Sequence, residues 1–149
     1  MHKYHNLEPI QCAGKEIRDH SVKPFFHPYI FPKILLSNVR SLMSKVEEVE
    51  LCLKNELVDI ACICESWSAT EENVAFEGYD TYFKPRMTPN DITIAHGGGN
   101  RVICRSSIRN RVLTFSNIPK KHGFDVLWLW CRPKKLPKEV ASLVICVVY

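Results

Sequence analysis

A helical repeat framed by two short apolar runs constrains the fold of this chain more than any other feature. The repeat places apolar residues at steps of four, three, four and four: Leu42, Val46, Val49, Leu53 and Leu57. This spacing puts them on one stripe of an amphipathic helix, and Ser44 followed by Glu47 matches a capping box at its start. The flanking runs at residues 34–36 and 59–65 have the length of buried strands. The sequence therefore predicts a strand, helix, strand unit with two parallel strands.

The part of the chain after residue 65 predicts mostly strands. Short apolar or alternating runs, separated by Pro, Gly and Asn, cover residues 79–83, 101–105, 111–115, 126–131 and 143–149. Residues 143–148 are rich in β-branched side chains without alternation, which predicts a strand buried on both faces. The fold class is therefore α/β, with one βαβ-type unit followed by mostly β structure. Because natural domains rarely finish on such a strand, we expect residues 33–149 to be the N-terminal part of a larger, truncated domain.

Composition excludes several classes of protein. The 149 residues include 20 Lys and Arg against 16 Asp and Glu, a formal charge of +4, and 46% are hydrophobic, so the chain can bury a core. No run reaches the ~18 consecutive apolar residues of a membrane span, and no apolar signal segment follows the N-terminus. We expect an intracellular protein with no membrane partner. Residues 1–32 mix His, Pro and charged residues and predict a loosely ordered extension.

Two polar residues close the two strands of the predicted βαβ unit. Asn38 follows the first apolar run, and Glu65 ends the second. Because parallel strands bring their carboxyl ends to the same edge of a sheet, the amide and the carboxylate can together hold a hard cation and a phosphate. The alternative is an Asn in a turn and a Glu that caps the next segment, and the pattern alone favours that interpretation.

For three other groups of residues, glycines, cysteines and tryptophans, the pattern favours a structural role over a role in binding or catalysis. The triple glycine 97–99 lacks the spacing of a phosphate-binding loop and predicts a turn into a strand. Cys62 and Cys64 lack a second ligand pair at zinc-site spacing and predict core thiols. Trp128 and Trp130 alternate within a strand, which favours packing on one sheet face over base stacking.

A family resemblance rests on the order of several short motifs. They are Asn38-Val39-Arg40-Ser41-Leu42, Lys45, the Glu-rich helix, Val58-Asp59-Ile60, Glu65-Ser66-Trp67, Gly78-Tyr79, Arg86, Gly97-Gly98-Gly99 and Val147-Val148-Tyr149. In this order and approximate spacing, they resemble the apurinic-endonuclease-like domain of LINE-type (non-LTR) retrotransposons. That domain is a branch of the exonuclease/endonuclease/phosphatase superfamily, and the resemblance covers about residues 33–149.

The resemblance implies a deoxyribonuclease-like four-layer α/β sandwich, present here in part, and an Mg²⁺-dependent endonuclease that nicks DNA. It implies that Glu65 binds Mg²⁺, that Asn38 orients the phosphate and that Tyr149 donates a hydrogen bond to the phosphate. Arg40 and Arg86 are the implied DNA contacts. A functional enzyme of this kind would act in the nucleus.

The chain departs from the family pattern in two ways. It stops before the family's Asp-Asn motif and its terminal Asp-His pair, and the polar Asn100 and Arg101 follow the triple glycine where relatives have an apolar strand. We therefore expect a fragment that is inactive alone, binds Mg²⁺ weakly if at all, and self-associates through an exposed apolar sheet face. The candidates for that face are Trp128, Trp130 and the strand at residues 143–148. The alternatives are a non-catalytic module that binds nucleic acid or protein, and a retroelement relic without selected function.

Overall fold

The computed structural model describes residues 31–67, 74–88, 92–93, 97–115 and 124–149. The predicted extension at residues 1–32 lies outside this part of the chain except for its last two residues. No helix in the described residues is long and apolar enough to cross a membrane.

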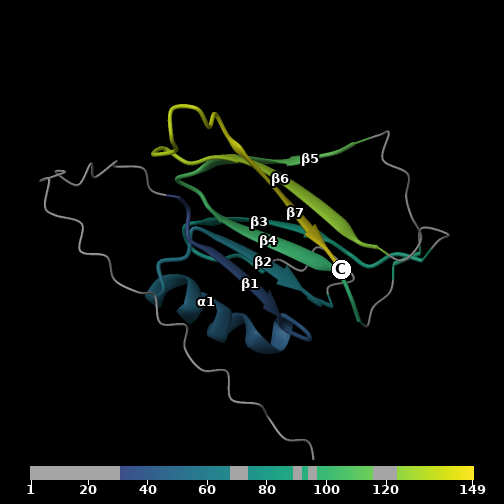
Figure 1. The fold of residues 1–149 in the computed structure, drawn as a ribbon. Coiled ribbons are helices and arrows are strands. Elements are labelled where there is room, and N and C mark those ends of the chain that lie inside the picture. The colour runs from purple at the N-terminus through teal and green to yellow at the C-terminus, as the bar shows by residue number, and fades with distance from the viewer. Residues whose placement is uncertain (1–30, 68–73, 89–91, 94–96, 116–123) are drawn as a thin grey trace, which may run out of the picture.

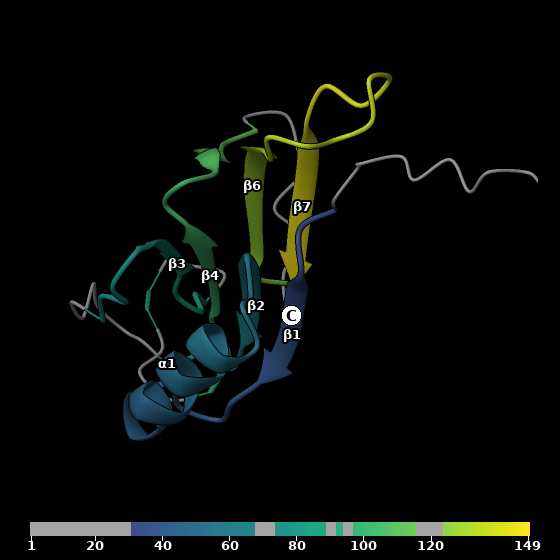
Figure 2. The ribbon, with the colours of Figure 1, turned by 90° about the vertical axis from the view of Figure 1, so that its left-hand side faces the viewer.

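The first sheet contains the predicted strand, helix, strand unit. Its strands lie in the order β1-β2-β4-β3, where β1 runs parallel to β2 and the other pairs are antiparallel. The bounds are β1 Ile34–Asn38, β2 Ile60–Cys64, β3 Tyr79–Lys84 and β4 Asn100–Arg105. The 3₁₀ turn η1 (Met43–Lys45) and the helix α1 (Val46–Asn55) connect β1 to β2, and α1 lies against one face of the sheet (Figures 1 and 2).

The ends of α1 differ from the predicted ones. The capping box is wrong, because the Ser44 hydroxyl donates to the Ser41 carbonyl at 3.2 Å and the N-cap is Lys45, without a side-chain cap. A 3₁₀ turn precedes the helix and shifts its start to Val46. Leu57 lies past the last turn with φ of 51° and is 70% exposed, so it leaves the apolar stripe. The central turns of the stripe contribute its buried residues, Val49 and Leu53.

The second sheet packs on the other face of the first. It is antiparallel, in the order β5-β6-β7, with bounds β5 Arg109–Leu113, β6 Val126–Arg132 and β7 Leu143–Val148. One core cluster lies between α1 and the first sheet, and includes Leu42, Leu53, Val58, Ile63, Phe76 and Ile103. A second cluster joins the two sheets, and includes Ile60, Cys62, Val102, Cys104, Leu127, Leu129, Cys131 and Val147. The described residues thus form a helix, sheet, sheet arrangement in three layers (Figure 2).

The strand predicted to be buried on both faces has one exposed face. In β7, Val147 is buried, but Val144 is 53% exposed, and Cys146 and Val148 are exposed as well. No described residues form a layer over this outer face, so the β-branched composition did not determine burial. Trp130 lies on the same face beside Val144, as its register partner.

The two tryptophans of this outer face are half-covered by side chains from their own sheet and its flank. The guanidinium of Arg111 lies 5.3 Å from the Trp130 ring centroid, and the ring of Phe115 meets Trp128 edge-on at 5.3 Å. The self-association expected through an exposed apolar face is not tested by these contacts. Of the residues expected on that face, those of β7 are more exposed than the two tryptophans.

Asn100 and Arg101 are buried within β4, although they interrupt the expected apolar strand. The Asn100 amide donates to the carbonyl of Asp125 at 2.6 Å and to that of Val147 at 3.3 Å, so it joins the two sheets. The guanidinium of Arg101 lies 5.4 Å from the ring centroid of Phe83. The fold therefore accommodates both residues.

Candidate active site

The carboxyl ends of β1 and β2 meet as the parallel register requires. Asn38 is the register partner of Cys64, which immediately precedes Glu65. Beyond the strands, the Val39 N–H donates to the Cys64 carbonyl at 3.1 Å, and the Ser41 N–H donates to the Glu65 carbonyl at 2.9 Å. These backbone bonds hold the two post-strand loops side by side, so the side chains of Asn38 and Glu65 meet.

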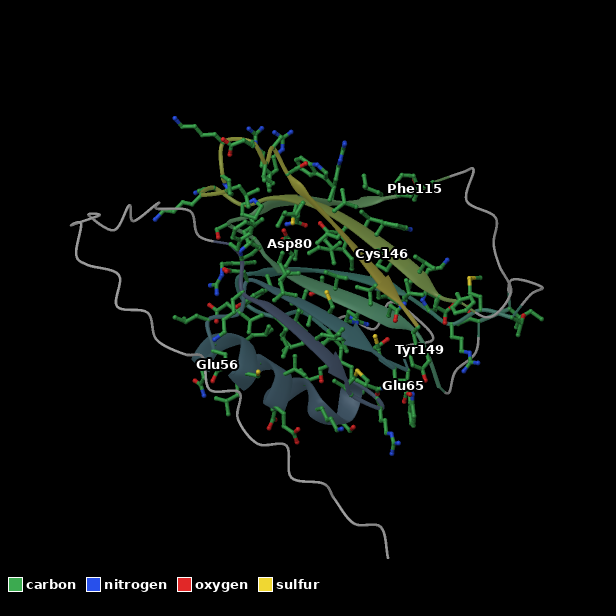
Figure 3. All side chains as sticks on the ribbon, in the orientation of Figure 1. Glu56, Glu65, Asp80, Phe115, Cys146 and Tyr149 are labelled. Atoms are coloured by element: carbon green, nitrogen blue, oxygen red, sulfur yellow. The ribbon has the colours of Figure 1, made fainter. Side chains whose placement is uncertain are left out.

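The Glu65 carboxylate is the centre of the site. The Asn38 amide donates to Glu65 Oε1 at 3.0 Å, and the Tyr149 hydroxyl donates to the same oxygen at 2.5 Å. Figure 3 shows Glu65 and Tyr149 close together at this end of the sheets. The hydrogen bond from Tyr149 lowers the pKa of Glu65 the most. The hydrogen bond from Asn38 and the charge of Arg40 lower it further. The carboxylate is therefore ionised at neutral pH.

A third loop, the triple glycine, supports the turn after β2. The Ser66 N–H donates to the Gly99 carbonyl and the Trp67 N–H to the Gly98 carbonyl, both at 3.1 Å. Glu65 and Trp67 have φ of 52° and 53°, in the left-handed region that non-glycine residues rarely occupy. Such conformations cost free energy and persist where surrounding contacts impose them, which is common at functional sites.

Gly98 is required by the path of Arg86. Its φ is 73°, and a Cβ built there would lie 2.5 Å from Arg86 Cδ. Arg86 therefore lies across the glycine loop, and its charge opposes the rise in the pKa of Tyr149 that the hydrogen bond to Glu65 causes. The resemblance implied that Arg86 contacts DNA; here it is exposed and lies near Tyr149.

Asp125 is a site residue that sequence reasoning missed. Its backbone exchanges two hydrogen bonds with Tyr149, at 3.0 and 3.1 Å. Its carboxylate accepts from the backbone N–H groups of Gly99 and Met87 and is attracted to Arg86, although burial, the largest effect, raises its pKa. Asp125 thus connects Tyr149 to the glycine loop. The available signal was an acidic residue directly before the apolar run of β6.

The metal ligand set of the described residues is small. They contain no group of three or more His, Cys, Asp or Glu side chains placed to hold a metal ion. Glu65 offers an ionised carboxylate at the strand ends, which fits one ligand of Mg²⁺, an ion that binds one or two carboxylates and keeps several waters. All six histidines lie outside the described residues.

No protein-family model matches the sequence, and no curated protein matches it significantly. Solved structures do match. The AP endonuclease LMAP from Leishmania major has a TM-score of 0.59 and 14% identity, over 90% of this chain and 44% of that one. The chain therefore shares part of the fold of this AP endonuclease. The predicted deoxyribonuclease-like α/β fold is thereby confirmed, and the chain spans less than half of the length of LMAP. The human Nocturnin catalytic domain with bound sulfate has a TM-score of 0.44 and 18% identity, over 78% of this chain and 50% of that one.

Proposed function

We propose that this chain carries part of the active site of an Mg²⁺-dependent DNA endonuclease of the kind found in LINE-type retrotransposons. One observation carries the proposal: Asn38 and Tyr149, from different sheets, donate to the same oxygen of the ionised Glu65. The fold shared with an AP endonuclease supports it, and so does the motif order in the sequence. An enzyme of this kind acts in the nucleus, where its DNA is.

Each residue of the site has a role suited to its chemistry. Glu65 is the ligand that holds Mg²⁺, and when bound the ion supplies charge that stabilises the phosphoryl and leaving oxygens. Asn38 has a second amide N–H to donate to a phosphate oxygen, whereas the single O–H of Tyr149 reaches a phosphate only by leaving Glu65 Oε1. Arg40 and Arg86 provide positive charge for the DNA backbone, and Arg86 keeps its position only because residue 98 is Gly.

The isolated chain is expected to bind without cleaving. Glu65 supplies one carboxylate, with the Tyr149 hydroxyl hydrogen-bonded to it and Asp125 beside Tyr149. The described residues contain no group of three or more His, Cys, Asp or Glu side chains that would hold a metal ion there for hydrolysis. Hydrolysis therefore requires groups beyond this set. The noncatalytic part of the proposal, binding of metal and phosphate, remains measurable on this chain alone.

Metal binding is the direct test of Glu65. Electron paramagnetic resonance of Mn²⁺, used as a probe for Mg²⁺, is recorded with the chain and a short DNA duplex. We expect Glu65→Gln to weaken Mn²⁺ binding by about tenfold or more, because the variant removes the ligand charge. Glu56→Gln is the matched control, since Glu56 is an exposed carboxylate paired with Lys33 away from the site (Figure 3). Equal Mn²⁺ binding by the wild type and Glu65→Gln contradicts the proposal.

A nicking assay tests the expected inactivity. Supercoiled DNA incubated with the chain and Mg²⁺ should show no nicking above background, and Glu65→Ala should change nothing measurable. Mg²⁺-dependent nicking that disappears in both Glu65→Ala and Asn38→Ala would show instead that the site of this chain is sufficient, alone or in a second copy.

A further inference from the structure

We propose that two copies of this chain associate through the side of the molecule formed by the free edges of β1 and β7. The sheet orders put β1 at the end of the first sheet and β7 at the end of the second. Figure 2 shows both strands on the same side of the molecule, one above the other. Each strand therefore leaves the hydrogen-bonding groups of one edge without a strand partner among the described residues.

An apolar groove separates the two free edges. Its volume is about 390 Å³, and it is lined by Ile34, Leu36, Cys62, Cys64, Cys146, Val147 and Val148. Leu36 is 72% exposed, Ile34 52% and Val148 49%, and they line one groove together rather than standing singly on the surface. Contiguous apolar surface of this kind marks interaction sites on otherwise polar proteins.

Charge favours a second copy at this side rather than at the outer face of the second sheet. Neither β1, with the sequence ILLSN, nor β7, with LVICVV, contains a charged residue. Lys33, just before β1, is neutralised by Glu56 at 2.9 Å. The two strands themselves therefore bring no like charges together, and the lysines Lys134, Lys135 and Lys138 lie in the loop before β7. On the outer face, Arg109 and Arg111 stack over Trp130, so pairing of two outer faces would bring like charges together.

The edge of β7 suits pairing with its own copy. The strand is β-branched and lacks the Lys, Pro or inward charge that blocks association at natural sheet edges. An antiparallel pair of β7 strands across a two-fold axis supplies a partner to the free β7 edge of each copy and places the groove of each copy beside the contact. Such isologous contacts are the commonest kind in homo-oligomers. The inference does not depend on the proposed function, since it requires neither metal nor nucleic acid.

Sedimentation equilibrium of the full chain tests the proposal. We expect twice the 17.2 kDa chain mass at concentrations on the order of 100 µM. Leu36→Lys and Val148→Lys each place a charge in the groove, and each should raise the dissociation constant by about tenfold or more. Leu51→Lys is the matched control, because Leu51 is a 60% exposed leucine of α1 that does not line the groove; it should leave the constant unchanged. Far-UV circular dichroism checks that the variants fold.

Three results would overturn the inference. The first is a monomer at all concentrations. The second is a dimer that Leu36→Lys and Val148→Lys leave intact. The third is a dimer that Trp130→Lys dissociates while the two groove variants do not, because association then uses the outer face of the second sheet.

Discussion

The central strands β2 and β4 of the first sheet are covered on both faces, whereas the second sheet is covered on one. The strand β2 lies between α1 and the second sheet, and its residues 60–63 are all buried. The strand β7 has a similar apolar sequence, yet alternate residues are exposed. Two strands of like composition therefore have different environments. Burial on both faces depends on the layers that pack on a strand, not on its β-branched content alone.

The largest expected effect is a loss of stability at a covered face, measured against a substitution on an open face. Leu53→Ala should lower the free energy of unfolding by about 3 kcal/mol, because Leu53 is fully buried between α1 and the first sheet. Val144→Ala on the open face of β7 should change it by less than about 0.5 kcal/mol. Urea denaturation in dilute solution measures both. Similar decreases in the free energy of unfolding for the two variants would mean that the outer face of the second sheet is covered in solution.

An intermediate effect is expected at the contact between the sheets. Asn100→Ala leaves the carbonyls of Asp125 and Val147 without their buried donor, which should cost about 2 kcal/mol. Hydrogen exchange should speed up more in β6 and β7 than in β1 and β2, because the second sheet has fewer layers to hold it. The exposed Asn55, at the end of α1, supplies the control Asn55→Ala. Uniform acceleration in both sheets would mean that they unfold as one unit.

The smallest effect concerns the hydrogen bond between the end of the second sheet and the first. Tyr149→Phe should raise the pKa of Glu65, because it removes the donor that lowers that pKa most. Carboxyl chemical shifts followed by NMR during an acid titration measure the change, and Tyr82→Phe, distant in β3, should leave it unaltered. An unchanged Glu65 pKa in Tyr149→Phe would show that the bond is not formed in solution.

The pH range of this bond follows from the same shifts. The pKa of Glu65 is lower in the folded chain, so its stabilising contribution is present above the unfolded pKa and is lost as pH falls through the lowered value. The pKa of Tyr149 is raised, so its contribution is present below the unfolded pKa and is lost as pH rises through the raised value. The bond between them is therefore strongest between these two limits, across neutral pH.

Local patterns predicted the parts of the molecule that depend on local chemistry. The apolar stripe through Val49 and Leu53 predicted the helix. The two parallel strands on either side of it in the sequence predicted that Asn38 lies next to Glu65. For β7 the sequence supported two expectations, burial on both faces and a place on an exposed sheet face, because the pattern does not show which layers pack there. Asp125 was missed for a related reason, since its contacts with the glycine loop join segments far apart in the sequence.

The shared oxygen of Glu65 has a thermodynamic consequence. Asn38 belongs to β1 and Tyr149 follows β7, so the arrangement forms only when the two sheets are packed together. A ligand that binds this arrangement in preference to the separated sheets must therefore shift the equilibrium toward the packed state. The rise in melting temperature with ligand concentration would then measure occupancy of the site, even in a chain that performs no chemistry.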